Sequence, residues 1–255
     1  MKLENFKGVV TGGASGMGRH FSLALVQAGA HVAAADVNEE GLASLAEEAR
    51  DLPGKLITFK TDVSNEADVI GLVGGAWEAF GGLNGLVNNA GITRDGLLVK
   101  TDRETGLVKG MPLKQWQQVL DVNLTGAFLC TRELVQRVVE KKAGPAVIVN
   151  ISSISRYGNM GQGNYTAAKA ALAADTEVWA KELARYGIRV GCVAPGFTET
   201  PMTAAMKPEM LEMMKKSIPL GRAASPGEQF MGVKFIIECD FFTGRTIDID
   251  GGMRL

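Results

Sequence analysis

The feature that most constrains the fold is a glycine-rich loop between an apolar run and a helix-period run. The sequence TGGASGMG at 11–18 follows the apolar run Lys7–Thr11 and leads into Met17–Ala28. Glycine permits a tight turn and a close approach of backbone to a pyrophosphate, whose charge then faces a helix N-terminus. Because a predicted strand precedes the loop and a predicted helix follows it, we interpret it as a dinucleotide site formed by Gly12, Ser15, Gly16, Met17 and Gly18.

Strand-like and helix-like runs alternate along the rest of the chain. Several strand-like runs, such as AVIVNI at 146–151, are continuously apolar, which is typical of parallel strands buried on both faces. The predicted strands are Lys7–Thr11, His31–Asp36, Leu56–Lys60, Gly85–Asn88, Ala146–Ile151, Arg189–Val193 and Thr246–Ile249. The predicted helices are Met17–Ala28, Glu39–Arg50, Glu66–Phe80, Pro112–Glu140 and Tyr165–Arg185. The alternation predicts an α/β fold in which residues 1–255 form a single domain, a doubly wound parallel sheet (Rossmann fold) of about seven strands flanked by helices.

The stretch LLVKTDRETGLVKGMPL at 97–113 interrupts this alternation. Alternating residues on both sides of R-E-T-G favour a small hairpin, and the charges would equally suit an exposed surface loop. Both interpretations remain open from the sequence.

Composition argues against several classes of protein. Lys and Arg number 27 and Asp and Glu 28, a net charge of −1, so a nucleic-acid partner is not expected. No apolar run approaches the ~20 residues that span a bilayer, and the N-terminus lacks the apolar core of a signal peptide. Cys130, Cys192 and Cys239 are widely spaced and only two histidines occur, so no metal-ligand pattern is present. We therefore expect a cytoplasmic protein with no metal and no membrane partner.

Asp36 ends the second predicted strand, 36 − 18 = 18 residues after Gly18. A carboxylate there can accept hydrogen bonds from the adenosine ribose hydroxyls and would repel a 2′-phosphate. We therefore expect NAD rather than NADP, although Arg19, just after the loop, is a cation that could override one carboxylate. The alternative is a turn or helix-capping aspartate before Asn38–Glu40.

Acid–base residues lie in ISSISRYGNMGQGNYTAAK at 151–169. Tyr165 and Lys169 are four apart and share a helix face, where the lysine cation favours the phenolate of the tyrosine. Asn164 is the expected N-cap of that helix. Ser152, 165 − 152 = 13 residues before Tyr165 at the end of a predicted strand, is the serine expected to hold a substrate oxygen. Tyr157 lacks a lysine four residues on and is expected at most to line the pocket.

With these motifs in place the sequence resembles the short-chain dehydrogenase/reductase family over nearly its whole length. The matching motifs are TGGASGMG at 11–18, Asp62-Val63, NNAG at 88–91, Asn123 in DVNLTG, Ser152, YTAAK at 165–169 and PGFTET at 195–200. The resemblance implies hydride transfer between a nicotinamide and a ketone or secondary alcohol, with Asn123, Ser152, Tyr165 and Lys169 as catalytic residues. It also implies that Asn123 holds a water that extends a proton relay from Lys169.

The same resemblance implies further cofactor contacts. Asp62 and Val63 would contact the adenine, Asn89, Ala90 and Gly91 the adenosine ribose side, and Lys169 the nicotinamide ribose. The remaining expected contacts come from the PGFTET motif and comprise Pro195, Gly196, Thr198 and Thr200.

Within the family the chain looks most like the 3-oxoacyl-[acyl-carrier-protein] reductases, by NAGITRDGLL, PGFTETPMT and GRTIDIDGGMRL. It departs from them in Asp36, because those reductases usually use NADPH, and in about ten extra residues at 97–113. Docking of an acyl carrier protein requires a basic patch, which Arg132, Arg137, Lys141 and Lys142 could supply, unless they form an ordinary solvated helix face.

The segment at 198–217 is expected to cover the substrate. Met206, Met210, Met213 and Met214 share a helical face that would suit an acyl chain or pack onto the body. The alternative substrates are a small alcohol, a sugar or a hydroxysteroid, and the alternative from another class is a non-catalytic nucleotide-sensing protein. By family resemblance we expect a homotetramer assembled through helices 112–140 and 165–185 and the C-terminal strand.

Overall fold

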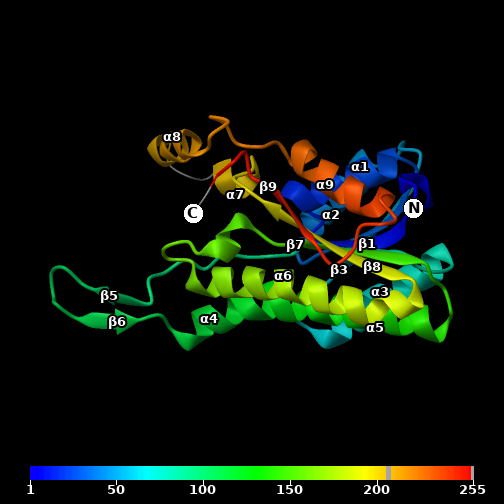
Figure 1. The fold of residues 1–255 in the computed structure, drawn as a ribbon, viewed down its shortest axis with the longest axis horizontal. Coiled ribbons are helices and arrows are strands. Elements are labelled where there is room, and N and C mark those ends of the chain that lie inside the picture. Colours follow the sequence, from blue (N-terminus) through cyan, green and yellow to red (C-terminus); the bar gives the residue numbers. More distant parts are fainter. Residues whose placement is uncertain (205–207, 254–255) are drawn as a thin grey trace.

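A seven-stranded parallel sheet forms the centre of the computed structural model, which describes residues 1–204 and 208–253 (Figure 1). Its order is β3 (Lys55–Lys60), β2 (His31–Asp36), β1 (Lys7–Thr11), β4 (Gly85–Asn88), β7 (Ala146–Ile151), β8 (Ile188–Pro195) and β9 (Thr246–Ile249). The predicted strands are confirmed to within two residues at each end. Every residue of β4 and β7 is buried, which explains why these segments read as continuous apolar runs.

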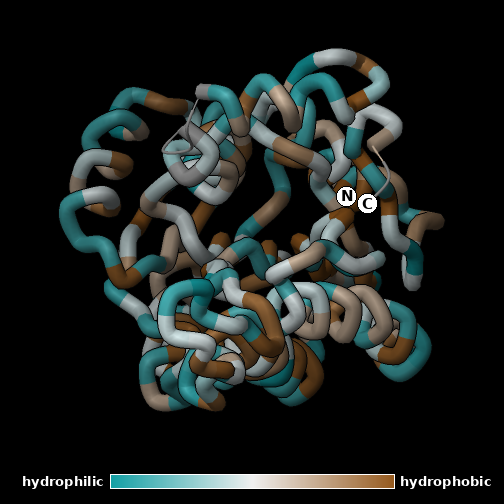
Figure 2. Tube along the Cα trace, turned by 90° about the vertical axis from the view of Figure 1, so that its left-hand side faces the viewer, coloured by the Kyte–Doolittle hydropathy of each residue, from teal (hydrophilic) through white to brown (hydrophobic). Residues whose placement is uncertain are grey.

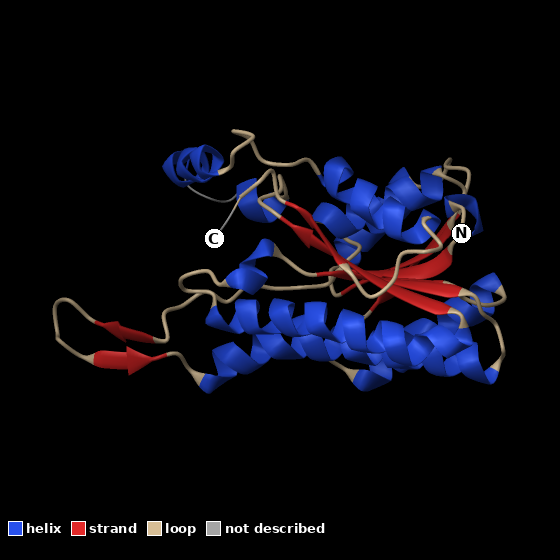
Figure 3. Cartoon of the chain, in the orientation of Figure 1, coloured by secondary structure: helices blue, strands red, loops and turns tan. Residues whose placement is uncertain are grey.

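Helices cover both faces of the sheet in two layers (Figure 3). One face packs on α1 (Gly16–Gln27) and α9 (Pro226–Glu238) through Phe21, Leu25, Val233 and Ile236. The other packs on α3 (Glu66–Phe80) and on α5 (Gly126–Glu140) through residues such as Leu72 and Leu134. The helix α2 (Glu39–Glu48) adds a smaller cluster around Ala34. Along the helices, hydrophobic and hydrophilic residues alternate in the hydropathy colouring, as amphipathic helices require (Figure 2).

The strand order reverses beside β1, which pairs with β2 on one side and β4 on the other. The segments that follow β1 and β4 therefore leave the sheet next to each other at its carboxyl edge. In doubly wound sheets this switch point is where ligands bind. The glycine loop after β1 and the NNAG segment after β4 lie at this point.

The long helix predicted for Pro112–Glu140 is not continuous. It consists of α4 (Leu113–Leu120), a π-helical turn (Asp121–Thr125) and α5. In the π turn the Gly126 N–H donates to the Asp121 carbonyl, five residues back. Such a turn alters the side-chain register within a helix, and it is common at functional sites. Here it contains Asn123.

The hairpin interpretation of 97–113 is confirmed. Strand β5 (Val99–Thr101) pairs antiparallel with β6 (Val108–Gly110), and the pair projects away from the body as a separate two-stranded sheet (Figures 1 and 3). Asp102 shapes the turn, because its carboxylate accepts hydrogen bonds from the backbone N–H groups of Glu104 and Thr105.

The segment after β8 contains α7 (Pro201–Ala204) and α8 (Pro208–Ser217). Met210 and Met213 on α8 are exposed, Met214 is half-buried, and Met206 lies outside the described residues. In the described part of the chain, no helix is both long and apolar enough to cross a membrane.

Candidate active site

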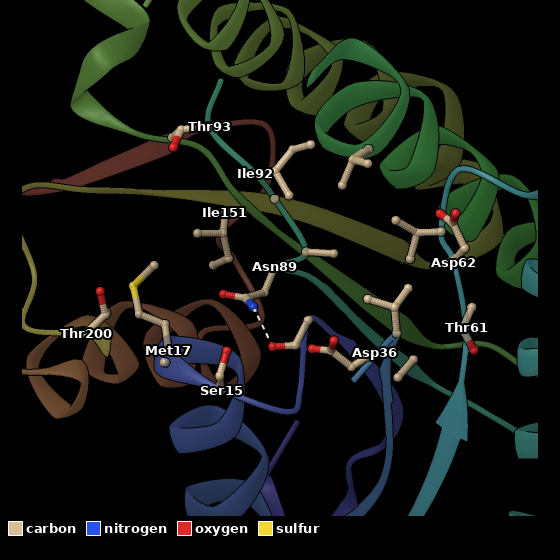
Figure 4. Close-up of a pocket in the computed structure, with 18 of the residues that line it drawn as sticks. Ser15, Met17, Asp36, Thr61, Asp62, Asn89, Ile92, Thr93, Ile151 and Thr200 are labelled. Carbon is tan, nitrogen blue, oxygen red and sulfur yellow. Dashed lines mark hydrogen bonds between the residues drawn. The ribbon is translucent and has the colours of Figure 1, made fainter. Parts of the chain in front are cut away.

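A cavity of about 490 Å³ opens at the switch point of the sheet (Figure 4). One side is formed by Asp36 at the end of β2 and by Thr61 and Asp62 after β3. The other side carries Ser15 and Met17 from the start of α1 and Thr200 from the segment after β8. The cavity is also lined by Tyr165 and Lys169 of α6 (Gly163–Leu183), so a single site joins the predicted cofactor and catalytic residues.

The glycine loop is shaped for a close-fitting ligand. Gly12 and Gly16 have φ angles of +67° and +54°, in the left-handed region that favours glycine. At Gly18, a Cβ would lie 2.1 Å from the Gly12 carbonyl oxygen, so any side chain there would force the loop apart. Ser15 is the N-cap of α1, whose N-terminus faces the cavity as an anion site requires.

Asn89 ties this loop to the end of β4. Its side-chain Nδ2 donates to the carbonyls of Thr11, at 3.0 Å, and Gly12, at 3.3 Å. The Thr11 hydroxyl in turn accepts hydrogen bonds from the backbone N–H groups of Asn89 and Ala90. The two segments on either side of the switch point are therefore held together independently of a ligand.

Asp36 has a structural role as well as a place in the cavity wall. Its carboxylate accepts a hydrogen bond from the Ala14 N–H, at 3.0 Å, and from the Asn38 N–H, at 3.1 Å. Each carboxylate oxygen therefore keeps a lone pair for a further donor such as a ribose hydroxyl. The turn interpretation and the cofactor interpretation of Asp36 are thus compatible.

The cations near Asp36 are engaged elsewhere. Arg19 donates to the Gly41 carbonyl and to the side chains of Ser44 and Glu48, the last at 2.6 Å. Lys60, which pairs with Asp36 in the sheet register, forms an ion pair with Glu39. Among the described residues that line the cavity, Lys169 is the one cation, and it lies with the catalytic residues rather than beside Asp36.

Tyr165 and Lys169 lie one turn apart on α6, as predicted. The Lys169 ammonium is buried, donates to the Ile151 carbonyl at 2.7 Å, and lies 5.7 Å from the centre of the Tyr165 ring. Burial lowers the pKa of Lys169 to about 8. Burial raises the pKa of Tyr165, a hydrogen bond from Ser153 lowers it, and the negative charge of Asp95 raises it.

The two adjacent serines face different partners. The Ser152 hydroxyl donates to the Lys169 backbone carbonyl at 2.7 Å, so Ser152 contributes to the cavity wall with its hydroxyl turned into the protein. The Ser153 hydroxyl accepts from the Ser155 N–H, and the Ser153 side chain acts on the Tyr165 phenol by lowering its pKa. The structure therefore places Ser153, which the sequence interpretation set aside, against the acid–base residue.

Strand alternation could have indicated this difference. Residues two apart on a strand point to the same face. Asn150 and Ser152 both face α6, where Asn150 donates to the Thr176 hydroxyl and Ser152 to the Lys169 carbonyl. Ser153, one residue on, points to the other side, where its hydroxyl accepts from the Ser155 N–H.

Asn123 lies behind the cavity wall and is buried. Its side chain forms two hydrogen bonds with the backbone of Ile92, accepting from the N–H at 2.8 Å and donating to the carbonyl at 3.0 Å. Gly91 lies between Asn123 and Lys169, since a Cβ on it would lie 3.5 Å from both the Asn123 Oδ1 and the Lys169 Nζ. The side chain of Asn123 thus fixes the loop after β4 next to the catalytic lysine.

Asn164 is not the N-cap of the catalytic helix. The helix begins at Gly163, and Asn164 is fully buried in its first turn. Its Nδ2 donates to the carbonyls of Arg94, at 2.9 Å, and Gln115, at 3.3 Å. Asn164 therefore connects the start of α6 to the loop after β4 and to α4, a contact that local sequence could not reveal.

Most of the predicted site residues line the cavity, and a few do not. The lining set contains Gly12, Ser15, Gly16, Met17, Asp36, Asp62, Val63, Asn89, Ala90, Gly91, Ser152, Tyr165, Lys169 and Thr200. Gly18, Asn123, Pro195, Gly196 and Thr198 lie outside that wall. The Thr198 side chain is buried and bonds to Gln229 and to the Gly196 carbonyl. Sequence reasoning missed eight lining residues: Ala35, Val37, Thr61, Ile92, Thr93, Val122, Ile151 and Pro201.

Tyr157 lies away from the cavity. Its side chain is 59% exposed and its hydroxyl donates to Asp248 at 3.2 Å. Tyr165 is therefore the tyrosine of the site.

Comparison with known proteins agrees with this geometry. Residues 8–211 match the family model described as short chain dehydrogenase. The chain belongs to the short chain dehydrogenase family. It is 41% identical over 256 residues to the 3-oxoacyl-[acyl-carrier-protein] reductase FabG of Thermotoga maritima, and the match covers 99% of each chain. Identity to the enzyme of the same name from Aquifex aeolicus is 37%, again over 99% of each chain.

Solved structures share this fold, among them a short-chain type dehydrogenase/reductase from Mycobacterium marinum with a TM-score of 0.86 and 29% identity, covering 98% of this chain and 96% of that one. The chain superposes with a TM-score of 0.88 and 29% identity on a protein from Agrobacterium tumefaciens provisionally assigned as a gluconate dehydrogenase, covering 99% of this chain and 97% of that one. As a member of this family, the protein is an NAD(P)-dependent oxidoreductase that acts on a ketone or secondary alcohol.

Proposed function

We propose that this protein is a 3-oxoacyl thioester reductase that prefers NADH. The thioester assignment is supported by full-length similarity to reductases of that name, and the cofactor preference by the charges around Asp36. Asp36 and Asp62 line that end of the cavity, and Arg19 and Lys60 are paired with Glu48 and Glu39. A 2′-phosphate would therefore meet carboxylates, because the one cation among the described lining residues, Lys169, lies with the catalytic residues rather than beside Asp36.

The residues present fit a nicotinamide dinucleotide. Positive-φ glycines, the α1 N-terminus and the Asp36 carboxylate occupy the cavity wall in the order that a pyrophosphate and an adenosine ribose require. Gly12, Gly16 and Ser15 would hold the pyrophosphate, Asp36 and Asp62 the adenosine half, and Lys169 and Thr200 the nicotinamide half. When bound, the cofactor supplies or accepts the hydride.

Residues of the protein bind the substrate oxygen and transfer its proton. We infer that Tyr165 donates a proton to the carbonyl oxygen in reduction and removes it in oxidation. Ser153, rather than Ser152, would donate a hydrogen bond to the same oxygen, because the Ser153 side chain lowers the pKa of the Tyr165 phenol and the Ser152 hydroxyl already donates to the Lys169 carbonyl. The buried Lys169 cation would stabilise the phenolate. Asn123 would hold the loop at Ile92 rather than act on the substrate, and the water relay through Asn123 stays a prediction.

The burial of Tyr165 predicts how each direction responds to pH. A raised pKa keeps the phenol protonated, which suits reduction, and alcohol oxidation should accelerate as pH rises toward that pKa.

A substrate panel tests the proposal. Purified protein is assayed with acetoacetyl thioesters, with gluconate and related sugar acids, and with small alcohols and hydroxysteroids, each with NADH or NAD. We expect the largest kcat/KM for the thioesters. Higher kcat/KM for gluconate would favour a sugar-acid dehydrogenase, an alternative supported by the structural similarity above.

Tyr165→Phe tests the catalytic assignment, since it removes the proton donor and keeps the ring. It should reduce turnover of the best substrate by about 100-fold or more, the usual contribution of a positioned acid–base group. Cofactor binding without turnover of any substrate would instead indicate a nucleotide-sensing protein. We further propose a homotetramer, which light scattering would test.

A further inference from the structure

The hairpin β5–β6 is an exposed element with a fixed base. Every residue from 97 to 110 is exposed, including Leu98 at 79% and Val108 at 67%. An isolated two-stranded hairpin is at best marginally stable in water. Exposed apolar side chains on such an element indicate a surface that contacts another molecule.

The register divides the hairpin into two faces. Lys100 pairs with Lys109, and the backbone bonds from Met111 to Leu98 and from Asp102 to Leu107 extend the same register. Directly opposed residues of antiparallel strands point to the same side, and side chains alternate along each strand. The pairs Leu98–Met111 and Asp102–Leu107 therefore lie on the same side as Lys100 and Lys109. We call the side that carries Leu98, Lys100, Asp102, Leu107, Lys109 and Met111 the lysine face.

The lysine face carries two directly opposed like charges. Directly opposed cations destabilise a strand pair. Within residues 1–204 and 208–253 no ion pair reaches Lys100 or Lys109. Asp102 is the next residue along that side, but its carboxylate is directed into the turn, where it accepts from Glu104 and Thr105. Two cations flanked by Leu98 and Leu107 are complementary to an acidic surface with apolar side chains.

The base of the hairpin is fastened to the catalytic loop. The Gly96 N–H donates to the Gly161 carbonyl at 2.7 Å, and Gln162 donates to the Asp95 carboxylate at 3.1 Å. Gln115 and Asn164 both donate to the Arg94 carbonyl at 2.9 Å. Gln162 and Asn164 lie within three residues of Tyr165. These hydrogen bonds therefore hold the base of the hairpin in place beside the active site.

The alternative basic patch on α5 is poorly suited to docking. Arg132 forms an ion pair with Glu66 and Arg137 with Glu133. Lys141 and Lys142 are exposed, but they follow the C-terminal end of α5, at the opposite end of the molecule from the hairpin (Figure 1). Within one protomer, a partner held there would lie far from the carboxyl edge of the sheet where the cavity opens.

We propose that the lysine face is the docking surface for an acidic carrier protein that presents the acyl thioester to the cavity. This rests on the proposed function and adds to it the residues that recognise the carrier. The carrier's carboxylates lie between Lys100 and Lys109, and its apolar side chains pack on Leu98 and Leu107. The small-molecule part of the substrate does not contact the lysine face.

The experiment compares one acyl group on two supports. Acetoacetyl is supplied on acyl carrier protein and on N-acetylcysteamine, and kcat/KM is measured for wild type, for Lys100→Glu/Lys109→Glu, and for the matched control Lys141→Glu/Lys142→Glu. We expect kcat/KM of the hairpin variant, Lys100→Glu/Lys109→Glu, to fall about tenfold or more with the carrier and to stay within about twofold of wild type with the small thioester. The reason is that surface charges act on the rate at which two proteins associate. The control should match wild type with both.

Added salt should lower the wild-type kcat/KM with the carrier and leave the kcat/KM with the small thioester unchanged. Activity of the hairpin variant on the small thioester also shows that it is folded. If wild type reduces neither thioester, the proposed function fails; if it reduces both and the hairpin variant shows no selective loss with the carrier, the docking proposal fails alone.

Three further results would overturn the docking assignment. A loss in the Lys141/Lys142 control alone would move the docking surface to the end of α5. An equal loss by the hairpin variant with acetoacetyl coenzyme A would mean that the lysines bind phosphate groups rather than a protein. A change of molar mass of the hairpin variant in light scattering would mean that a second copy of this chain covers the lysine face.

Discussion

The side chain of Ser153 lowers the pKa of the Tyr165 phenol, while the neighbouring Ser152 hydroxyl donates to the backbone carbonyl of Lys169. Two adjacent serines thus have different roles. One can assist a reacting oxygen, and the other holds the helix that carries the catalytic pair.

This relationship gives a paired mutational prediction. Ser153→Ala should lower kcat by about 100-fold or more, because it removes a donor directed at the reacting oxygen. Ser152→Ala should change kcat by no more than a few-fold and should lower the free energy of unfolding by about 1 kcal/mol, the usual net value of a hydrogen bond. Steady-state kinetics and urea unfolding measure the two effects. The reverse pattern, with Ser152 dominating kcat, would return the role to Ser152.

The charges around Asp36 predict the cofactor preference. Wild type should show a higher kcat/KM with NADH than with NADPH. Asp36→Ala should lower the ratio of kcat/KM with NADH to kcat/KM with NADPH. Since Asp36 also accepts from the Ala14 N–H, the variant should lose some affinity for NADH as well.

Arg19→Gln is the matched control for this experiment. Because Arg19 is bonded to Glu48, Ser44 and the Gly41 carbonyl, its loss should leave the NADH to NADPH ratio nearly unchanged. A wild-type preference for NADPH that disappears in Arg19→Gln would contradict the assignment.

Lys169 makes stability depend on pH in a defined direction. Its pKa is about 8 in the folded protein against an ordinary 10.5, so between these values the unfolded chain binds more protons than the folded one. Stability must therefore rise with pH in this window. Relative to Lys169→Met, wild type should gain roughly 1 kcal/mol of unfolding free energy between pH 7 and pH 9.

Urea unfolding of both proteins at the two pH values measures this difference, and groups that titrate in both proteins cancel. A difference that stays constant or decreases with pH would show that Lys169 keeps an ordinary pKa.

The glycine loop predicts a steric effect on cofactor binding. In Gly18→Ala the new methyl group would lie 2.1 Å from the Gly12 carbonyl oxygen and 2.4 Å from the Asn89 Nδ2. The loop must shift, so the dissociation constant for NADH, measured by fluorescence titration, should rise by at least about tenfold. Gly71→Ala in α3 is the control, because a Cβ there has no atom within 4 Å. Unchanged binding in Gly18→Ala would mean that the loop relaxes freely.

Local patterns in the sequence determined the sheet, the glycine loop and the Tyr165–Lys169 pair. Continuous apolar runs mark strands buried on both faces, and a spacing of four residues on a helix sets a shared face whatever the surroundings. These features depend on backbone geometry over a few residues. The seven strands, the position of the loop after β1 and the one-turn separation of Tyr165 and Lys169 therefore agree with the structure.

Only the tertiary structure decided which serine reaches Tyr165, where Asn164 directs its amide and which cations remain free. Ser153 is distinguished from Ser152 by the direction in which the chain leaves β7, and Asn164 by a loop that lies 70 residues earlier in the chain. Arg19 is engaged by Glu48, 29 residues further along. Side-chain direction and charge pairing depend on segments distant in sequence, so no local pattern contains them.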